Sequence, residues 1–363
     1  MTTRPATTPL QVDLQPRWRI GREGGDTLDA TTLLDLLATV QATGSIAQAG
    51  RELGLSYRHA WGLLRQAEAL LGAPLLARGR GLGSALTELG ERLAWADARI
   101  GARLQPLLES LAAELEGELG RVQRRARSVP RLHASHGFAV AALREQLAAR
   151  QVPVEVRYRN SGEAVSALAH GECELAGFHV PLGAFEAEAA RRYLAWLRHD
   201  QHRLVQLAVR TQGLFVAPGN PLGLRGVSDL ARPGVRFVNR PEGSGTRMLT
   251  ELLLQREGID ARAVAGYDNT ELTHAAVAAF VASGMADVGI GVQTAAQRFG
   301  LHFVPLLKER YFFAVPSNAL HRADLGPVLA VLRSAALRSR VAALPGYEAA
   351  QTGQVLTLAE AFG

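Results

Sequence analysis

Residues 45–72 read SIAQAGRELGLSYRHAWGLLRQAEALLG, and this stretch decides the architecture of the N-terminal third. Ser45 is a suitable N-cap for a short helix that ends near Leu53, and Gly54 suits the positive φ of a tight turn. A second helix begins after Ser56 and carries one apolar stripe, formed by Ala60, Leu63, Leu64, Ala67, Leu70 and Leu71. The pattern predicts a helix-turn-helix, in which the second helix presents its first residues to base edges in the DNA major groove.

The polar residues off this stripe are the predicted DNA contacts: Ser45, Ser56, Tyr57, Arg58, His59 and Arg65. The alternative is a helical hairpin whose polar face is only solvated. The next stretch, APLLARGRGLGSALTELG (73–90), favours DNA binding, because Leu75–Arg78 and Ala85–Thr87 can pair as the strands of a wing. Arg78 and Arg80 at its glycine-rich tip would then reach phosphates or the minor groove.

A long helix is predicted from Glu88 to about Leu119. Its apolar residues recur at steps of three and four: Leu89, Leu93, Ala96, Ile100, Leu104, Leu107, Leu111 and Leu115. This period suits pairing with a second copy, so we expect a homodimer or homotetramer on a double-stranded DNA operator with two-fold symmetry. The alternative is a helix packed on its own domain. Pro106 lies inside the pattern and is expected to kink the helix or split it in two.

The run from Gly44 to Leu93 resembles the winged helix-turn-helix of bacterial molybdate-responsive and LysR-type regulators. The resemblance covers about residues 25–120. SYRHAW (56–61) and the glycine-rich wing followed by Leu86-Thr87-x-x-Gly90 are most similar to the molybdate-responsive branch. The resemblance implies a DNA-binding transcriptional regulator, which is not an enzyme. We expect three N-terminal segments: a flexible arm over 1–24, the DNA-binding domain over 25–87 and the dimerisation helix over 88–120.

The pattern changes beyond RVQRRARSVPR (121–131), whose first ten residues we expect to form an exposed linker. Short apolar strands then alternate with helices, as in α/β architectures. The clearest units are strand and helix over 131–150, strand, helix and strand over 153–180, and strand, Gly/Ser loop and helix over 235–258. The predicted fold class is α+β multidomain: an all-α winged helix-turn-helix with a long dimerisation helix, then a two-lobed α/β domain.

The two α/β halves resemble the periplasmic-binding-protein fold. NSGEAVSALAHGECELAG (160–177), NRPEGSGTR (239–247) and THAAVAAFVASGMADVGIG (273–291) are similar to the binding domains of tungstate and molybdate transport proteins, and to a related domain fused to molybdenum-cofactor enzymes. The resemblance implies an effector domain over 131–363 with its ligand between two lobes. Lobe I is expected over 131–212 and 315–363, and lobe II over 213–314.

Three predicted strand-to-helix junctions carry small polar residues at a helix start, at 134–137, 160–162 and 243–247. A helix N-terminus has unpaired N–H groups and about half a positive charge, so such junctions bind anions. The alternative is that each residue is only a helix cap. The predicted ligand-binding residues are Ser135, His136, Asn160, Ser161, Ser244, Gly245, Thr246, Arg247 and Tyr267, with His179 as a further candidate.

The second resemblance points to molybdate or tungstate as the effector. Molybdate-responsive regulators usually carry a small β-barrel oxyanion domain, and no such segment is visible here. A carboxylate or a molybdenum-cofactor-related ligand would fit the same donors. Two other classes stay open: a solute-binding protein that does not bind DNA, and an enzyme of molybdenum-cofactor metabolism. The enzyme would need a catalytic motif, and G-x-x-x-x-G-K-[ST], H-E-x-x-H and G-x-S-x-G are all absent.

The composition fits a globular protein of two or three domains. The chain has 363 residues, 47% of them hydrophobic, and a formal net charge of +6, which permits nucleic-acid binding. Cys173 is the only cysteine, so no intramolecular disulfide or multi-cysteine metal site can form. The N-terminus lacks an apolar signal-peptide region, and Asp287 interrupts the longest apolar stretch, 275–292. We therefore expect a cytoplasmic protein with no membrane partner, no metal and no cofactor.

Overall fold

The computed structural model describes residues 12–77, 84–123 and 129–362. The chain divides into two compact units, an N-terminal unit over Gln15–Leu104 and a C-terminal unit over Gln105–Gly363 together with the first residues up to Leu14.

The N-terminal unit is a three-helix fold preceded by a β-hairpin. Strands β1 (Arg19–Gly21) and β2 (Thr27–Asp29) pair antiparallel and are followed by α1 (Thr31–Thr43), α2 (Ile46–Glu52) and α3 (Tyr57–Leu71). Gly44 and Gly72 end α1 and α3 in the left-handed conformation that favours glycine. The predicted helix-turn-helix is therefore present. The expectation that a flexible arm extends to residue 24 is wrong, because β1 lies within this range and pairs with β2.

A wing follows α3. Its two sides meet at an antiparallel bridge between Leu76 and Leu86, and the N–H of Ala77 donates to the carbonyl of Ala85 at 2.9 Å. The wing tip, with the predicted contacts Arg78 and Arg80, lies outside the described residues.

Helix α4 (Glu88–Gln123) is one continuous helix of 36 residues, so the expectation that Pro106 splits it is wrong. Pro106 lacks the N–H that would donate to the carbonyl of Ala102, but it is buried, so packing supports the turn that the proline weakens. The helix also runs three residues beyond the predicted end at 120. Four leucines at a spacing of four leave an exposed apolar face: Leu107, Leu111, Leu115 and Leu119.

One mixed sheet organises the C-terminal unit. Its strand order is β4-β3-β5-β9-β6-β8-β7, and two short strands pair with β6 outside this path. The strands are β3 (Arg131–Ala134), β4 (Glu155–Tyr158), β5 (Leu175–Pro181), β6 (His202–Val216), β7 (Phe237–Val238), β8 (Val288–Val292), β9 (His302–Pro316), β10 (Tyr347–Glu348) and β11 (Val355–Leu356).

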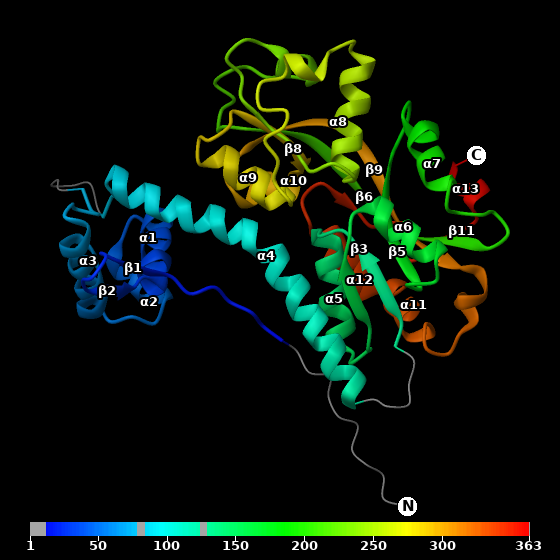
Figure 1. The fold of residues 1–363 in the computed structure, drawn as a ribbon, viewed down its shortest axis with the longest axis horizontal. Helices are drawn as coiled ribbons and strands as arrows, with labels where there is room; N and C mark the ends of the chain where they lie inside the picture. Colours follow the sequence, from blue (N-terminus) through cyan, green and yellow to red (C-terminus); the bar gives the residue numbers. More distant parts are fainter. Residues whose placement is uncertain (1–11, 78–83, 124–128, 363) are drawn as a thin grey trace, which may run out of the picture. The chain divides into compact units, whose positions relative to one another are not determined.

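Two long strands run through both lobes. β6 and β9 have 15 residues each and pair antiparallel along their whole length, and in Figure 1 they can be followed from the group around β8 to the group around β5. In lobe I the stretch Glu309–Ala314 of β9 pairs with β5. The predicted boundary at 314/315 is therefore wrong, because β9 already belongs to lobe I from about residue 308.

Helices cover both faces of this sheet. They are α5 (Phe138–Ala149), α6 (Ser161–Ala169), α7 (Glu186–Leu194), α8 (Gly245–Arg256), α9 (His274–Ala282), α10 (Gln293–Arg298), α11 (Gly326–Leu332), α12 (Ala335–Ala342) and α13 (Leu358–Phe362). One core joins α5, α11 and α12 to the sheet through Leu143, Leu207 and Phe313, and another centres on Phe178 and Leu249. The predicted two-lobed α/β fold is confirmed. Within the described parts of the chain, no helix is both long and apolar enough to cross a membrane.

Candidate functional site

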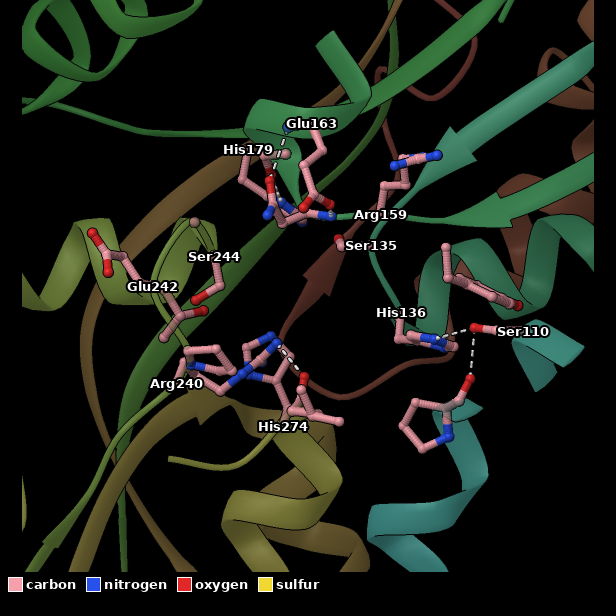
Figure 2. Close-up of a pocket in the computed structure, with 18 of the residues that line it drawn as sticks. Ser110, Ser135, His136, Arg159, Glu163, His179, Arg240, Glu242, Ser244 and His274 are labelled. Carbon is pink, nitrogen blue, oxygen red and sulfur yellow. Dashed lines mark hydrogen bonds between the residues drawn. The ribbon is translucent and has the colours of Figure 1, made fainter. Parts of the chain in front are cut away.

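The C-terminal unit contains a cavity of about 340 Å³, at the lower end of the size range of small-molecule pockets. Its walls come from the strand-to-helix junctions of both lobes and from Pro106, Leu107 and Ser110 of α4. Figure 2 shows Ser135, His179, Arg240 and Ser244 around one space, with Ser110 and His136 on the side of α4.

Helix N-termini from both lobes open onto this pocket. Asn160 caps α6, and its side-chain oxygen accepts from the N–H of Glu163 at 2.9 Å. Ser244 caps α8 in the same way, and Thr273 caps α9, whose first residue His274 lines the pocket. Because each N-terminus carries about half a positive charge, their convergence favours a negatively charged ligand.

Arg240 is the buried cation of the pocket. Its side chain is 7% exposed, and its Nη2 donates to the carbonyl of Leu272 at 2.7 Å, while its Nε has no hydrogen-bond partner. Burial, reinforced by the charge of Arg210, lowers the pKa of Arg240 to about 9. Among the described residues no carboxylate forms an ion pair with it, so its charge is available to a ligand.

The second buried arginine already has a partner. Arg210 on β6 lies directly opposite Glu309 on β9, and its Nε donates to Glu309 Oε1 at 2.5 Å. Gln212 bridges this pair to the pocket wall, since its amide donates to Glu309 at 2.9 Å and to the hydroxyl of Thr246 at 3.1 Å. Glu309 therefore balances Arg210. The wall also holds Arg159, Glu163 and Glu242, so its charges are mixed, and Arg240 is its buried cation without a carboxylate partner among the described residues.

Two buried histidines complete the polar wall. Burial and the two arginines hold the pKa of His179 and of His274 well below the usual value, so both rings are neutral near pH 7. His179 Nδ1 lies 3.4 Å from the hydroxyl of Ser161, and His274 Nδ1 has no partner. Each neutral ring supplies one N–H donor without adding charge.

The structure places seven of the nine predicted ligand residues on the pocket wall: Ser135, His136, Asn160, Ser161, Ser244, Gly245 and Thr246. His136 is turned toward α4. Its ring stacks on Tyr158 at 3.6 Å, its Nδ1 lies 3.3 Å from Glu109, and its Nε2 lies 3.4 Å from the hydroxyl of Ser110. This ring therefore joins the pocket wall to α4.

The other two predicted ligand residues lie away from the pocket. Arg247 is the third residue of α8, and its Nε donates to Glu251 at 3.0 Å. Its guanidinium also lies 4.0 Å from the centre of the Tyr267 ring. Glu251 and Tyr267 therefore hold the Arg247 side chain, and the expectation that Arg247 and Tyr267 contact the ligand is wrong for this pocket, because neither lines it.

Sequence reasoning missed Arg210, Arg240 and His274. A signal existed for the first, because Arg210 interrupts a long apolar strand, VQLAVRTQGLFV. Arg240 directly follows the buried strand in VRFVNRP, where strand ends of α/β sheets place binding residues. A charged residue at such a position requires either a partner or a ligand.

On the N-terminal unit, most of the predicted DNA contacts lie at the start of α3, with Arg65 further along the same helix. Tyr57 is 58% exposed, and Arg58, His59 and Arg65 are exposed beside it. Ser56 is also the N-cap of α3, because its hydroxyl accepts from the N–H of His59 at 3.2 Å. Ser45 caps α2 in the same way.

No cluster of three or more metal-ligating side chains occurs among the residues with described positions. Cys173 is buried, and burial raises the pKa of its thiol to about 12. The pocket therefore offers hydrogen bonds and positive charge to a ligand, without a resident nucleophilic thiolate.

Two family descriptions match the chain. Residues 31–91 match "Bacterial regulatory helix-turn-helix protein, lysR family", and residues 143–333 match "PBP superfamily domain". The second match covers more than half of the chain.

Individual relatives are similar to parts of the chain. The uncharacterized protein YvgK of Bacillus subtilis is 32% identical over 203 residues, 55% of this chain and 64% of YvgK. The molybdenum-pterin-binding protein MopB of Rhodobacter capsulatus is 40% identical over 84 residues, 22% of this chain and 31% of MopB. The chain thus spans just under two thirds of YvgK.

Among solved structures, a cysteine mutant of Corynebacterium glutamicum OxyR with bound H2O2 is 14% identical with a TM-score of 0.42. The match covers 87% of this chain and 95% of that one. The chain therefore belongs to the PBP superfamily through its larger part, and its residues 31–91 form a domain of the bacterial regulatory helix-turn-helix, lysR family type.

Proposed function

We propose that this protein is a homo-oligomeric transcriptional regulator whose C-terminal unit binds a small oxyanion, with molybdate and tungstate as the first candidates. The observation that carries the proposal is Arg240, a buried cation without a carboxylate partner among the described residues, at a pocket where several helix N-termini converge. Hydroxyls of Ser135, Ser161 and Thr246 line the same pocket. The similarity to MopB, a molybdenum-pterin-binding protein, supports molybdenum chemistry as the starting point.

DNA binding is assigned to α3 and the wing. The exposed Tyr57, Arg58, His59 and Arg65 share the start or the solvent side of α3, while the apolar stripe of the helix is buried in the three-helix core. Arginine contacts to phosphates make such binding strongly dependent on salt. The exposed leucine face of α4 supports a second copy as its partner, since exposed apolar patches of this kind mark interfaces.

The test of the effector is calorimetric titration of the full chain with molybdate, tungstate, sulfate, phosphate and formate. Micromolar or tighter binding of molybdate or tungstate is expected, with a loss of at least tenfold in Ser135→Ala and Thr246→Ala. Ser228→Ala, an exposed serine outside the pocket, is the matched control. Unchanged affinity in both pocket variants would contradict the assigned site.

The pocket volume favours a second candidate ligand. About 340 Å³ leaves room for an organic anion that places one charged group beside Arg240. The same titrations with small carboxylates and phosphorylated pterins distinguish the two. If an organic anion binds and no inorganic oxyanion does, the organic anion replaces molybdate and tungstate as the proposed effector. If no anion of either set binds, the proposal of anion sensing is refuted.

The regulator is distinguished from a solute-binding protein by DNA binding. The full chain is incubated with a randomised duplex library, and the bound fraction is sequenced. We expect enrichment of a two-fold symmetric sequence. Absence of any enriched sequence at low salt would refute the proposal.

A further inference from the structure

Behind the pocket lies a second, smaller cavity, which we call the inner recess. It is lined by Ser135, Gly137, His179, Arg210, Tyr311 and Tyr347, with Ala139 and Val140 of α5. Its volume is about 10 Å³, roughly the space for one water molecule or one monatomic ion. A four-oxygen anion does not fit such a volume.

Two tyrosine hydroxyls in the inner recess make no hydrogen bond of normal geometry to the described residues, although Ser135 lies beside that of Tyr311 and Arg210 beside that of Tyr347. Tyr311 is 2% exposed and Tyr347 is 8% exposed, and both hydroxyls are buried. Leaving a buried hydroxyl unpaired costs about 1–3 kcal/mol, so two at one cavity indicate an occupant. Strand pairing positions them, because Tyr311 lies opposite His179 and Tyr347 lies opposite Arg210.

Helix α5 contributes the next donors. Asn160, Ser244 and Thr273 cap other helices of this unit with their side chains, but the N-cap of α5 is Gly137, which has no side chain to accept a hydrogen bond. Ala139 and Val140, the second and third residues of α5, line the inner recess. Their N–H groups are the ones that an N-cap oxygen normally accepts from. An occupant with acceptor character would take the place of the missing cap.

Two positively charged groups face the inner recess. Arg210 Nη1 lies close to Gly137, because a Cβ atom added to this glycine would be 3.8 Å from that nitrogen. The N-terminus of α5, the positive end of its dipole, faces the same recess. Burial raises the pKa of both tyrosines, so their hydroxyls stay protonated and can donate. Glu309 balances Arg210 through Nε, and no carboxylate is among the described residues that line the inner recess.

We propose that the inner recess is a binding site for one monatomic anion, a halide such as chloride. The hydroxyls of Tyr311, Tyr347 and Ser135 and the first N–H groups of α5 donate to it, and Arg210 supplies charge. A neutral water molecule would satisfy the hydroxyls, but it would leave the positive end of the α5 dipole without an anion. The halide would add one negative charge behind the pocket wall that Ser135, His179 and Arg210 share with it.

Bromide is the probe. Crystals of the full chain, grown with bromide as the only halide, are measured at the bromine absorption edge. We expect an anomalous peak within hydrogen-bond distance of the hydroxyls of Tyr311 and Tyr347. An ordered water molecule without anomalous signal, an empty recess, or bromide bound only elsewhere on the protein would overturn the proposal.

A solution measurement gives an independent readout. Melting temperature is compared in sodium bromide and sodium gluconate at equal ionic strength, and a tenfold excess over the dissociation constant should raise it by about 3–6 °C. The double variant Tyr311→Phe/Tyr347→Phe should lose this rise. Tyr267→Phe, which lies outside both cavities, should keep it. If the double variant does not fold, the anomalous map of the unaltered protein decides alone.

Discussion

Replacing Arg240 by methionine should stabilise the ligand-free protein and weaken anion binding at the same time. The pKa of Arg240 falls from 12.5 to about 9 on burial, and each unit corresponds to about 1.4 kcal/mol, so burying the charged form costs roughly 5 kcal/mol. Methionine removes that cost and fills most of the volume. It also removes the hydrogen bond to the carbonyl of Leu272, and this loss destabilises the protein by about 1–3 kcal/mol.

The net expectation for Arg240→Met is a gain of about 2–4 kcal/mol in the free energy of unfolding without ligand. For a unit of this size, that gain raises the melting temperature by roughly 5–15 °C. The variant also loses a charge-assisted hydrogen bond to the anion, about 1.5–3 kcal/mol, so affinity should fall about 10- to 150-fold.

Calorimetry and thermal unfolding of the full chain measure both quantities, with Arg262→Met, an exposed arginine of lobe II, as the matched control. A ligand-free melting temperature below that of the unaltered protein would show that another group compensates the buried charge of Arg240. Undiminished anion affinity would refute its role as the charge partner of the ligand.

Three further predictions concern other parts of the chain. Burial, together with Arg159 and Arg157, lowers the pKa of His133 to about 4, so the unfolded chain takes up a proton at a higher pH than the folded one. The free energy of unfolding should therefore fall by up to about 3 kcal/mol as the pH drops from 6.5 to 4, which urea unfolding measures. His133→Leu should make this free energy depend less on pH, and an equal dependence in the variant would contradict the prediction. The double variant Leu111→Glu/Leu115→Glu should raise the dissociation constant of the homo-oligomer at least tenfold in sedimentation experiments, because each leucine contributes about 1.5–3 kcal/mol when buried. Glu114→Gln on the same helix is the control. An unchanged dissociation constant in the leucine variant would place the interface elsewhere. Arg58→Ala should relax sequence preference if Arg58 contacts a base, while Arg65→Ala should weaken all duplexes equally and reduce the salt slope by about one; an unaltered preference in Arg58→Ala would defeat that assignment.

Local sequence patterns predict the helices and their starts well. Ser45, Ser56, Asn160 and Ser244 each stand where an N-cap is expected, and each caps a helix. Such patterns also identify the junctions that line the pocket, because a strand that ends in small polar residues before a helix is visible in the sequence.

Long-range partners are what the sequence conceals. The ion pair of Arg210 and Glu309 joins residues 99 positions apart, and only the register of β6 on β9 brings them together. Arg247 looks like the natural charge for an anion because it lies in the same loop as Ser244, yet its neighbour one helical turn later, Glu251, holds it. Whether an arginine meets a carboxylate or a ligand depends on tertiary placement, which no local pattern records.

The shared strands β6 and β9 also determine the order in which the chain can fold during synthesis. Leu204 pairs with Ala314, so the central ladder cannot close until the ribosome has added about 110 further residues, and β10 and β11 pair with β6 later still. At about 5–20 residues per second, residues 204–314 alone take roughly 5–20 s. The N-terminal unit has all its residues by Leu104 and can complete its fold first. The nascent protein would therefore carry a finished helix-turn-helix before it has a working sensor, and an apolar half-sheet awaiting β9 would be its most aggregation-prone stage.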